Sequence, residues 1–100
     1  MDLSALTLET FLPYLNQSFG AGAEGIAPFR MELIEASPLR GWTPEDSPRK
    51  GFDLMFKVVE GEFRSQATLT ITHTDGSRWV FFCVPVLVPK PGRYVQAIFN

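Results

Sequence analysis

The sequence has few of the residues from which catalytic and metal sites are built. It contains one cysteine, Cys83, and one histidine, His73, in 100 residues. A single thiol excludes a disulfide within the chain. One histidine and one cysteine also fall short of the four ligands of a closed zinc site unless several carboxylates join them. We therefore predict no metal site and no cofactor.

Charge is sparse as well. Charged residues make up 20% of the chain, the net charge is −2, and the nine Lys and Arg residues are scattered, with Arg49 and Lys50 the one adjacent pair. A nucleic-acid partner is not expected, because phosphate contacts need a basic surface. No apolar stretch approaches the roughly 20 residues of a membrane-spanning helix, and the first ten residues do not resemble a signal peptide. We expect a soluble, cytoplasmic protein with no membrane partner.

Apolar and aromatic residues, by contrast, are abundant. Hydrophobic residues are 45% of the chain and aromatic residues 13%, including nine Phe. This composition argues against disorder and suffices for a core without disulfides or metal. We predict a single domain spanning residues 1–100.

The N-terminal segment is predicted to form a short helix. Thr7 is a good N-cap residue, and Leu6 before it can pack on Phe11 inside the helix. Pro13 interrupts helical hydrogen bonding, so we expect a short or kinked helix, or two separate turns. Asn16 is a plausible left-handed stop.

Most of the remaining chain has the pattern of β-strands. Residues 29–33, 52–58 and 67–73 alternate between apolar and other residues, and Leu33 followed by Ile34 indicates a bulge. A weak strand with a glycine-rich turn precedes them, and two apolar strands end the chain. Short turns without βαβ alternation favour antiparallel pairing. We predict an α+β, mainly β fold: a short N-terminal helix plus five or six antiparallel strands forming a curled sheet or small barrel.

The sequence Asp75-Gly76 predicts a two-residue hairpin loop, which sets a register. In that register Thr72 pairs with Trp79 and Ile71 pairs with Val80. Directly paired residues share a sheet face. The interior face is then predicted to carry Leu69, Ile71, Val80, Phe82 and Val84. The other face is predicted to carry Trp79, Phe81 and Cys83 among the threonines.

Two patterns that suggest chemistry have simpler interpretations. Residues 20–25, GAGAEG, match the glycine spacing of dinucleotide-binding loops, but Pro28 leads into a strand where that motif needs a helix. His73 would need a nucleophile or an orienting carboxylate, and Asp75 lies in the turn. The predicted register places Cys83 far from His73. We therefore predict no catalytic residues and no enzyme activity.

The candidate interaction residues are aromatic. Trp42 lies in the irregular stretch 37–50, where it either packs back onto the core or anchors a partner. Trp79 and Phe81 need a cover, which the helix or another chain would supply. The final strand, Tyr94 to Phe99, is predicted to present an unprotected edge on which a further strand could pair.

Four short stretches carry a resemblance to a known family. They are LTLETFLPYLNQSF (6–19), FDLMF (52–56), FCVPV (82–86) and AIFN (97–100). In these stretches the chain resembles small, uncharacterised bacterial domains of this length. Such domains are often encoded beside proteins with a phage tail-collar domain, the so-called microcystin-dependent proteins. The resemblance implies no catalytic residues and suggests an accessory of collar-type fibre or tail-like proteins.

Together these observations favour a non-enzymatic interaction or assembly-accessory module with a protein partner or self-association. The alternative is a small β-barrel that binds an apolar ligand inside. That alternative needs interior volume, which nine Phe and two Trp would tend to fill.

Overall fold

The computed structural model describes residues 6–38 and 51–99. In these residues a short helix α1 (Leu8–Phe11) and a 3-10 turn η2 (Leu12–Tyr14) precede six strands. The strands are β1 (Ser18–Ala23), β2 (Ile26–Pro38), β3 (Phe52–Glu60), β4 (Ala67–Thr72), β5 (Arg78–Val86) and β6 (Tyr94–Phe99). No helix in this part of the chain is long and apolar enough to cross a membrane.

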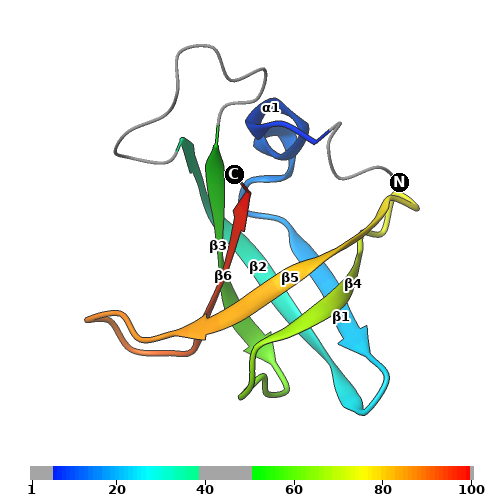
Figure 1. The fold of residues 1–100 in the computed structure, drawn as a ribbon, viewed down its shortest axis with the longest axis vertical. Coiled ribbons are helices and arrows are strands. Elements are labelled where there is room, and N and C mark those ends of the chain that lie inside the picture. The colour runs from blue at the N-terminus through cyan, green and yellow to red at the C-terminus, as the bar shows by residue number, and fades with distance from the viewer. Residues whose placement is uncertain (1–5, 39–50, 100) are drawn as a thin grey trace.

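The six strands form a closed barrel in the order β1-β2-β3-β6-β5-β4, with every neighbouring pair antiparallel (Figure 1). The predicted fold class is therefore confirmed. The register of β2 against β3 shifts between Leu33 and Glu35, which confirms the predicted bulge.

The prediction of an unprotected edge at the final strand is wrong. Strand β6 lies inside the sheet, between β3 and β5. The apolar run in β5 is long enough to pair with β4 along its first part and with β6 along its last part. Strand β3 pairs with the whole of β6, and β5 pairs with its first half, Tyr94 to Gln96, so no further strand can add along that half.

The N-terminal segment covers one end of the barrel, beside the end of β6 (Figure 1). The Thr7 N–H donates to Thr10 Oγ1 across 3.1 Å and helps to cap α1. Pro13 breaks the segment into two turns, and Asn16 ends it with a φ of 67°. The sequence predicted both features.

The side chain of Phe11 packs against the aromatic rings at this end of the core. Its ring centroid lies 5.4 Å from that of Trp79, 6.0 Å from that of Phe99 and 6.1 Å from that of Phe52. Phe11 and Leu6 are both buried. The N-terminal segment therefore completes the core at this end of the barrel. We call residues 6–17 the plug.

The predicted register of the β4–β5 hairpin is wrong by one residue. Thr72 pairs with Arg78 and Ile71 pairs with Trp79. The loop has three residues rather than two, because the His73 N–H donates to the Ser77 carbonyl and the Gly76 N–H donates to the His73 carbonyl. Only Gly76 in this loop has a positive φ, 95°. This arrangement is a turn followed by a residue in the left-handed region.

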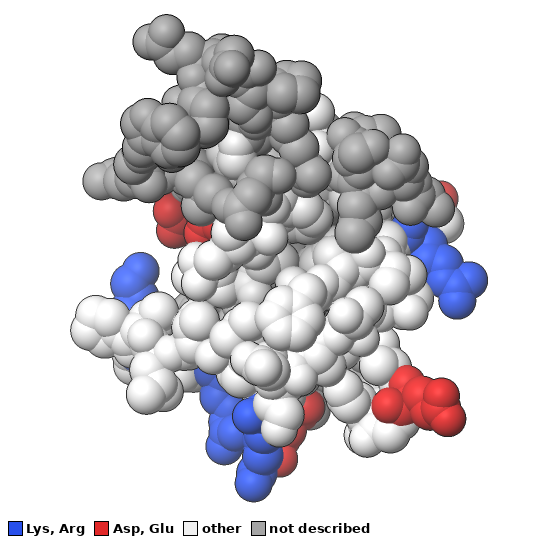
Figure 2. All heavy atoms as spheres, in the orientation of Figure 1, with Lys and Arg blue, Asp and Glu red and all other residues white. Residues whose placement is uncertain are grey.

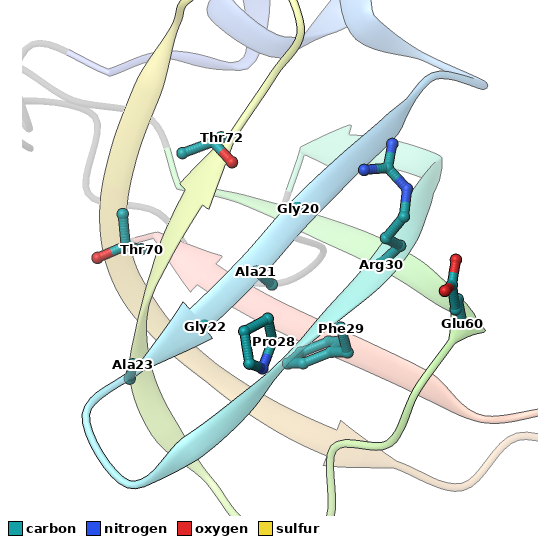
Figure 3. A pocket seen from close by; sticks show the side chains of 10 residues that line it. All are labelled: Gly20, Ala21, Gly22, Ala23, Pro28, Phe29, Arg30, Glu60, Thr70 and Thr72. Atoms are coloured by element: carbon teal, nitrogen blue, oxygen red, sulfur yellow. The ribbon is translucent and has the colours of Figure 1, made fainter.

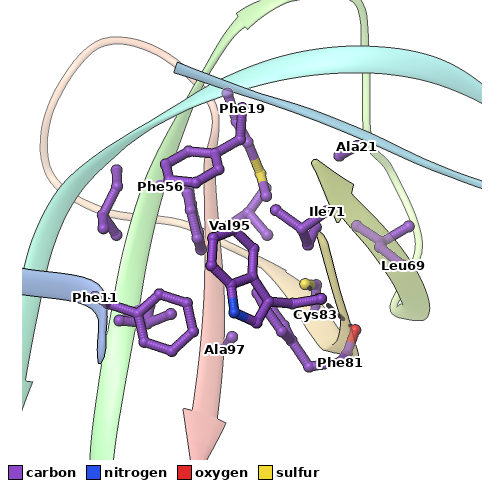
Figure 4. Packing of buried hydrophobic residues seen from close by; sticks show 14 of the residues in the cluster. Phe11, Phe19, Ala21, Phe56, Leu69, Ile71, Phe81, Cys83, Val95 and Ala97 are labelled. Atoms are coloured by element: carbon purple, nitrogen blue, oxygen red, sulfur yellow. Dashed lines mark hydrogen bonds between the residues drawn. The ribbon is translucent and has the colours of Figure 1, made fainter. Parts of the chain in front are cut away.

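The slip of one residue exchanges the two faces of β5, because side chains alternate along a strand. Phe81 and Cys83 point into the barrel with Leu69 and Ile71 (Figure 4). Trp79 lies on the same face of β5, and all five residues are buried. Val80 and Phe82 point outward. The prediction that Val80, Phe82 and Val84 line the interior was therefore wrong.

Candidate functional site

The outer surface of β5 and the end of β6 carry large apolar side chains that the chain does not bury. Val80 is 49% exposed, Phe82 is 51% exposed and Ile98 is 54% exposed. We call Val80, Phe82 and Ile98 the β5–β6 face. In β4, Thr70 pairs with Val80 and Thr68 pairs with Phe82, so uncharged hydroxyls border the face on one side.

The flank of the barrel around this face is poor in charge. After Arg78, the outward positions of β5 are Val80, Phe82, Val84 and Val86, and those of β6 are Tyr94, Gln96 and Ile98. The outward positions of β2 and β3 include Arg30, Glu32, Asp53 and Lys57. Figure 2 shows this flank as a white surface with charged side chains at its rim. An exposed phenylalanine in an uncharged surface is typical of an interaction site.

The aromatic residues singled out in the sequence lie elsewhere. Trp79 and Phe81 are buried inside the barrel, so the outer face of β5 carries Val80 and Phe82 in their place. Tyr94 and Phe99 are buried in β6. Trp42 lies outside the described residues. The geometric basis for an interaction through Trp79, Phe81 or the edge of β6 is therefore lost, and the exposed residues of the same two strands take their place.

Sequence reasoning missed Phe82 as a surface residue because β5 is apolar at almost every position. Because apolar and polar residues do not alternate in β5, its sequence does not indicate which side faces the core. The informative signal lies in the loop, where Thr74, Asp75 and Gly76 fit a three-residue connection as well as a two-residue one.

A polar cluster joins the plug to the β4–β5 hairpin. The Tyr14 hydroxyl donates to Asp75 Oδ2 across 2.8 Å and lies 3.0 Å from Ser77 Oγ. His73 Nε2 lies 2.6 Å from Gln17 Oε1, and His73 Nδ1 accepts the Asp75 N–H across 3.1 Å. These contacts join the N-terminal segment to a hairpin more than 50 residues further along the sequence.

The cluster contains one of the two contacts of a catalytic triad, since His73 Nδ1 lies 3.1 Å from Asp75 Oδ1. The contact between the serine and the imidazole differs. Among the described residues, the Ser77 hydroxyl contacts Tyr14 rather than the imidazole of His73. The Ser77 N–H and the Tyr14 hydroxyl hold the pKa of Asp75 well below its ordinary value, so this carboxylate is charged and fully engaged. We infer that these hydrogen bonds fix the N-terminal segment to the hairpin. We call the cluster the latch, and its residues are Tyr14, Gln17, His73, Asp75 and Ser77.

Cys83 is an unsuitable nucleophile. Burial raises the pKa of its thiol to about 12, because the low-dielectric core disfavours the thiolate. Its Sγ lies 3.8 Å from the Phe81 carbonyl oxygen. Within residues 6–38 and 51–99, no three His, Cys, Asp or Glu side chains come together as a metal site would require.

The glycine-rich segment forms part of a sheet rather than a phosphate-binding loop. Gly20 and Gly22 lie in β1, and the chain continues through a turn at Gly25 into β2 instead of a helix. Their missing side chains leave an open groove of about 520 Å³ on the outer surface (Figure 3). Thr70 and Thr72 border it on one side and Arg30 on the other.

These observations define a small closed β-barrel whose one end is plugged by its own N-terminal segment. The model of a family described as a domain of unknown function, DUF6916, matches residues 6–99. The chain belongs to this family, in agreement with its resemblance to a family of small domains. No curated protein and no solved structure matches the chain.

Proposed function

We propose that this protein is a non-enzymatic interaction module that binds a protein partner through the β5–β6 face. The observation that supports this proposal is the half-exposed Phe82 on β5, whose outward positions after Arg78 are all uncharged. Exposed aromatic side chains are the residues that most often dominate binding energy at protein interfaces. The sequence resemblance suggests the partner class, a collar-domain fibre, tail or surface protein.

The packing of the core favours this function over the alternative of an apolar ligand inside the barrel. Phe19, Phe56 and Phe81 fill the interior from three different strands, with ring centroids 5.9 Å apart for Phe19 and Phe56 and 6.5 Å apart for Phe56 and Phe81. Phe11 covers one end. Barrels that hold a ligand usually have about eight strands.

The test is the affinity of the purified protein for a collar-domain protein from the same genome, measured by titration calorimetry. Phe82→Glu places a charge at the centre of the face and should weaken binding at least about 30-fold, the effect expected of an interface hot spot. Val59→Glu is the matched control, because Val59 is 52% exposed on β3, outside the face. This control should retain wild-type affinity.

Two other outcomes of this binding experiment would contradict or change the proposal. If both variants bind the partner as tightly as the wild type, the β5–β6 face is not the binding surface and the proposal is wrong. If the wild-type protein alone sediments as a dimer that Phe82→Glu dissociates, the face binds a second copy rather than a collar protein.

A further inference from the structure

A second pocket lies at the end of the barrel opposite the plug. It has a volume of about 330 Å³ and lies between the turn that follows β3 and the loop that joins β5 to β6. Its apolar wall is formed by Phe63, Pro85, Leu87 and Tyr94. This volume is within the range of small-molecule sites. None of the residues of the β5–β6 face takes part in it.

The apolar wall is held in place by the core and by the loop. Phe63 is buried and stacks on Phe29 with ring centroids 5.3 Å apart. The Tyr94 hydroxyl donates to the Pro91 carbonyl oxygen across 3.1 Å. Gly92 has a φ of 111°, and a Cβ there would lie 3.0 Å from Lys57 Cε, so a glycine fits this bend best. The sides of the pocket formed by Phe63 and Tyr94 are therefore in place before any ligand arrives, whereas Leu87 is a fully exposed residue at the rim.

Two arginines, Arg64 and Arg93, line this pocket, and they differ in their ion pairs. Arg64 forms an ion pair with Glu62 across 2.8 Å. Among the described residues, Arg93 has no ion-pair partner, although the Val58 N–H holds its backbone carbonyl across 2.8 Å. Arg64, and to a smaller extent Arg93, keep the pKa of Glu62 below its ordinary value. Glu62 thus stays ionised and neutralises one of the two cations.

We infer that this pocket binds a carboxylate attached to an apolar body. The carboxylate would pair with the guanidinium of Arg93, whose planar fork suits two parallel hydrogen bonds. The apolar body would lie against Pro85 and Leu87, over the exposed edges of the largely buried Phe63 and Tyr94. Such a group occurs both in small aryl or alkyl acids and at the C-terminus of a peptide that ends in an apolar residue.

The probe is 3-phenylpropanoate, titrated into the ¹⁵N-labelled protein and followed by amide chemical shifts. We expect saturable shifts at Phe63, Arg93 and Tyr94. The neutral analogue 3-phenylpropanamide keeps the apolar body but lacks the charge. Its affinity should be lower than that of the acid by about ten-fold or more. A short peptide ending in Phe, compared with its amidated form, tests the peptide source. Tighter binding of the peptide acid than of the small acid assigns the site to a peptide terminus, and the reverse order assigns it to a small molecule.

Two variants test the residues. Arg93→Gln should reduce the affinity for 3-phenylpropanoate about ten-fold, whereas Arg78→Gln, an exposed arginine at the other end of the barrel, should leave it unchanged. Leu87→Ser removes one apolar contact from a fully exposed position that does not support the core, and should weaken binding several-fold. Equal binding of the acid and the amide, unchanged affinity in Arg93→Gln, or shifts confined to another region would overturn the inference.

Discussion

Gly76 is the residue on which the orientation of β5 depends. Its φ of 95° is a conformation that residues with a Cβ adopt at a cost, and it allows the hairpin loop to close over three residues. The backbone at this position therefore helps to set the register of β5 against β4.

We predict that Gly76→Val destabilises the protein by about 1 kcal/mol or more, because a β-branched residue resists a positive φ. Urea denaturation measures the loss. Thr74→Val, a change at an exposed position in the same loop where φ is not positive, is the control and should have a smaller effect. An unchanged midpoint in Gly76→Val would contradict this account of the loop.

Asp75 is the charged residue of the latch, and its titration should be visible in the stability of the fold. Its pKa is lowered in the folded state by the Ser77 N–H and then by the Tyr14 hydroxyl. A carboxyl group of this kind stabilises the fold above its ordinary pKa of 3.8, and this contribution is lost as the pH falls below that value.

Asp75→Asn should therefore lower the free energy of unfolding at pH 7 and flatten its decrease between about pH 4 and pH 2. Urea denaturation at a series of pH values gives both quantities for the wild type and the variant. Parallel pH profiles for the two proteins would show that Asp75 is not the group responsible.

At the scale of elements, the plug contributes to the core far more than its length suggests. Segments of one or two helical turns are unstable by themselves in water. Here α1 persists because Phe11 packs among Phe52, Trp79, Phe81 and Phe99. Tyr14 and Gln17 then bind the β4–β5 hairpin.

We predict that Phe11→Ala costs about 3–5 kcal/mol of stability, the range for truncating a buried phenylalanine. Leu12→Ala in the adjacent turn is the control. Leu12 is 42% exposed, so its truncation should cost about 1 kcal/mol or less. Thermal and urea unfolding compare the two, and similar losses would mean that Phe11 does not close the core.

At the scale of the whole molecule, closure of the barrel places two neighbouring phenylalanines in opposite environments. Phe81 is 2% exposed and Phe82 is 51% exposed. The outward side chains of β6, and those of β5 after Arg78, are uncharged, whereas those of β2 and β3 include charged residues, of which Asp53 pairs directly with Ile98. The proposed interaction follows from this difference.

Phe81→Glu should abolish folding, because it buries a charge in an apolar core without a partner. Phe82→Glu should leave the fold intact, with a circular dichroism spectrum and a denaturation midpoint close to those of the wild type. The pair is its own control, since the substitution is identical and the positions are adjacent. If Phe82→Glu unfolds the protein and Phe81→Glu does not, Phe82 is the buried residue, and the two-residue loop predicted from the sequence is the correct one.

The sequence by itself determined most of the secondary structure. Alternation in residues 29–33, 52–58 and 67–73 predicted which side of three strands is buried, because polar positions separate the apolar ones. Pro13 and Asn16 predicted the broken helix and its end, because their effects on the backbone are local. Leu33 followed by Ile34 predicted the bulge for the same reason.

Tertiary structure decided the rest. Strand β5 is apolar on both faces, so its own pattern does not show that Phe81 is inside and Phe82 outside. The hydrogen bonds of the His73–Ser77 loop and the pairing of β5 with β4 and β6 set that orientation. Pairing of β1 with β4 and of β3 with β6 joins residues far apart in the chain, and no local pattern encodes it. The exposed face and the pocket at Arg93 both depend on these long-range contacts, which is why the sequence placed neither.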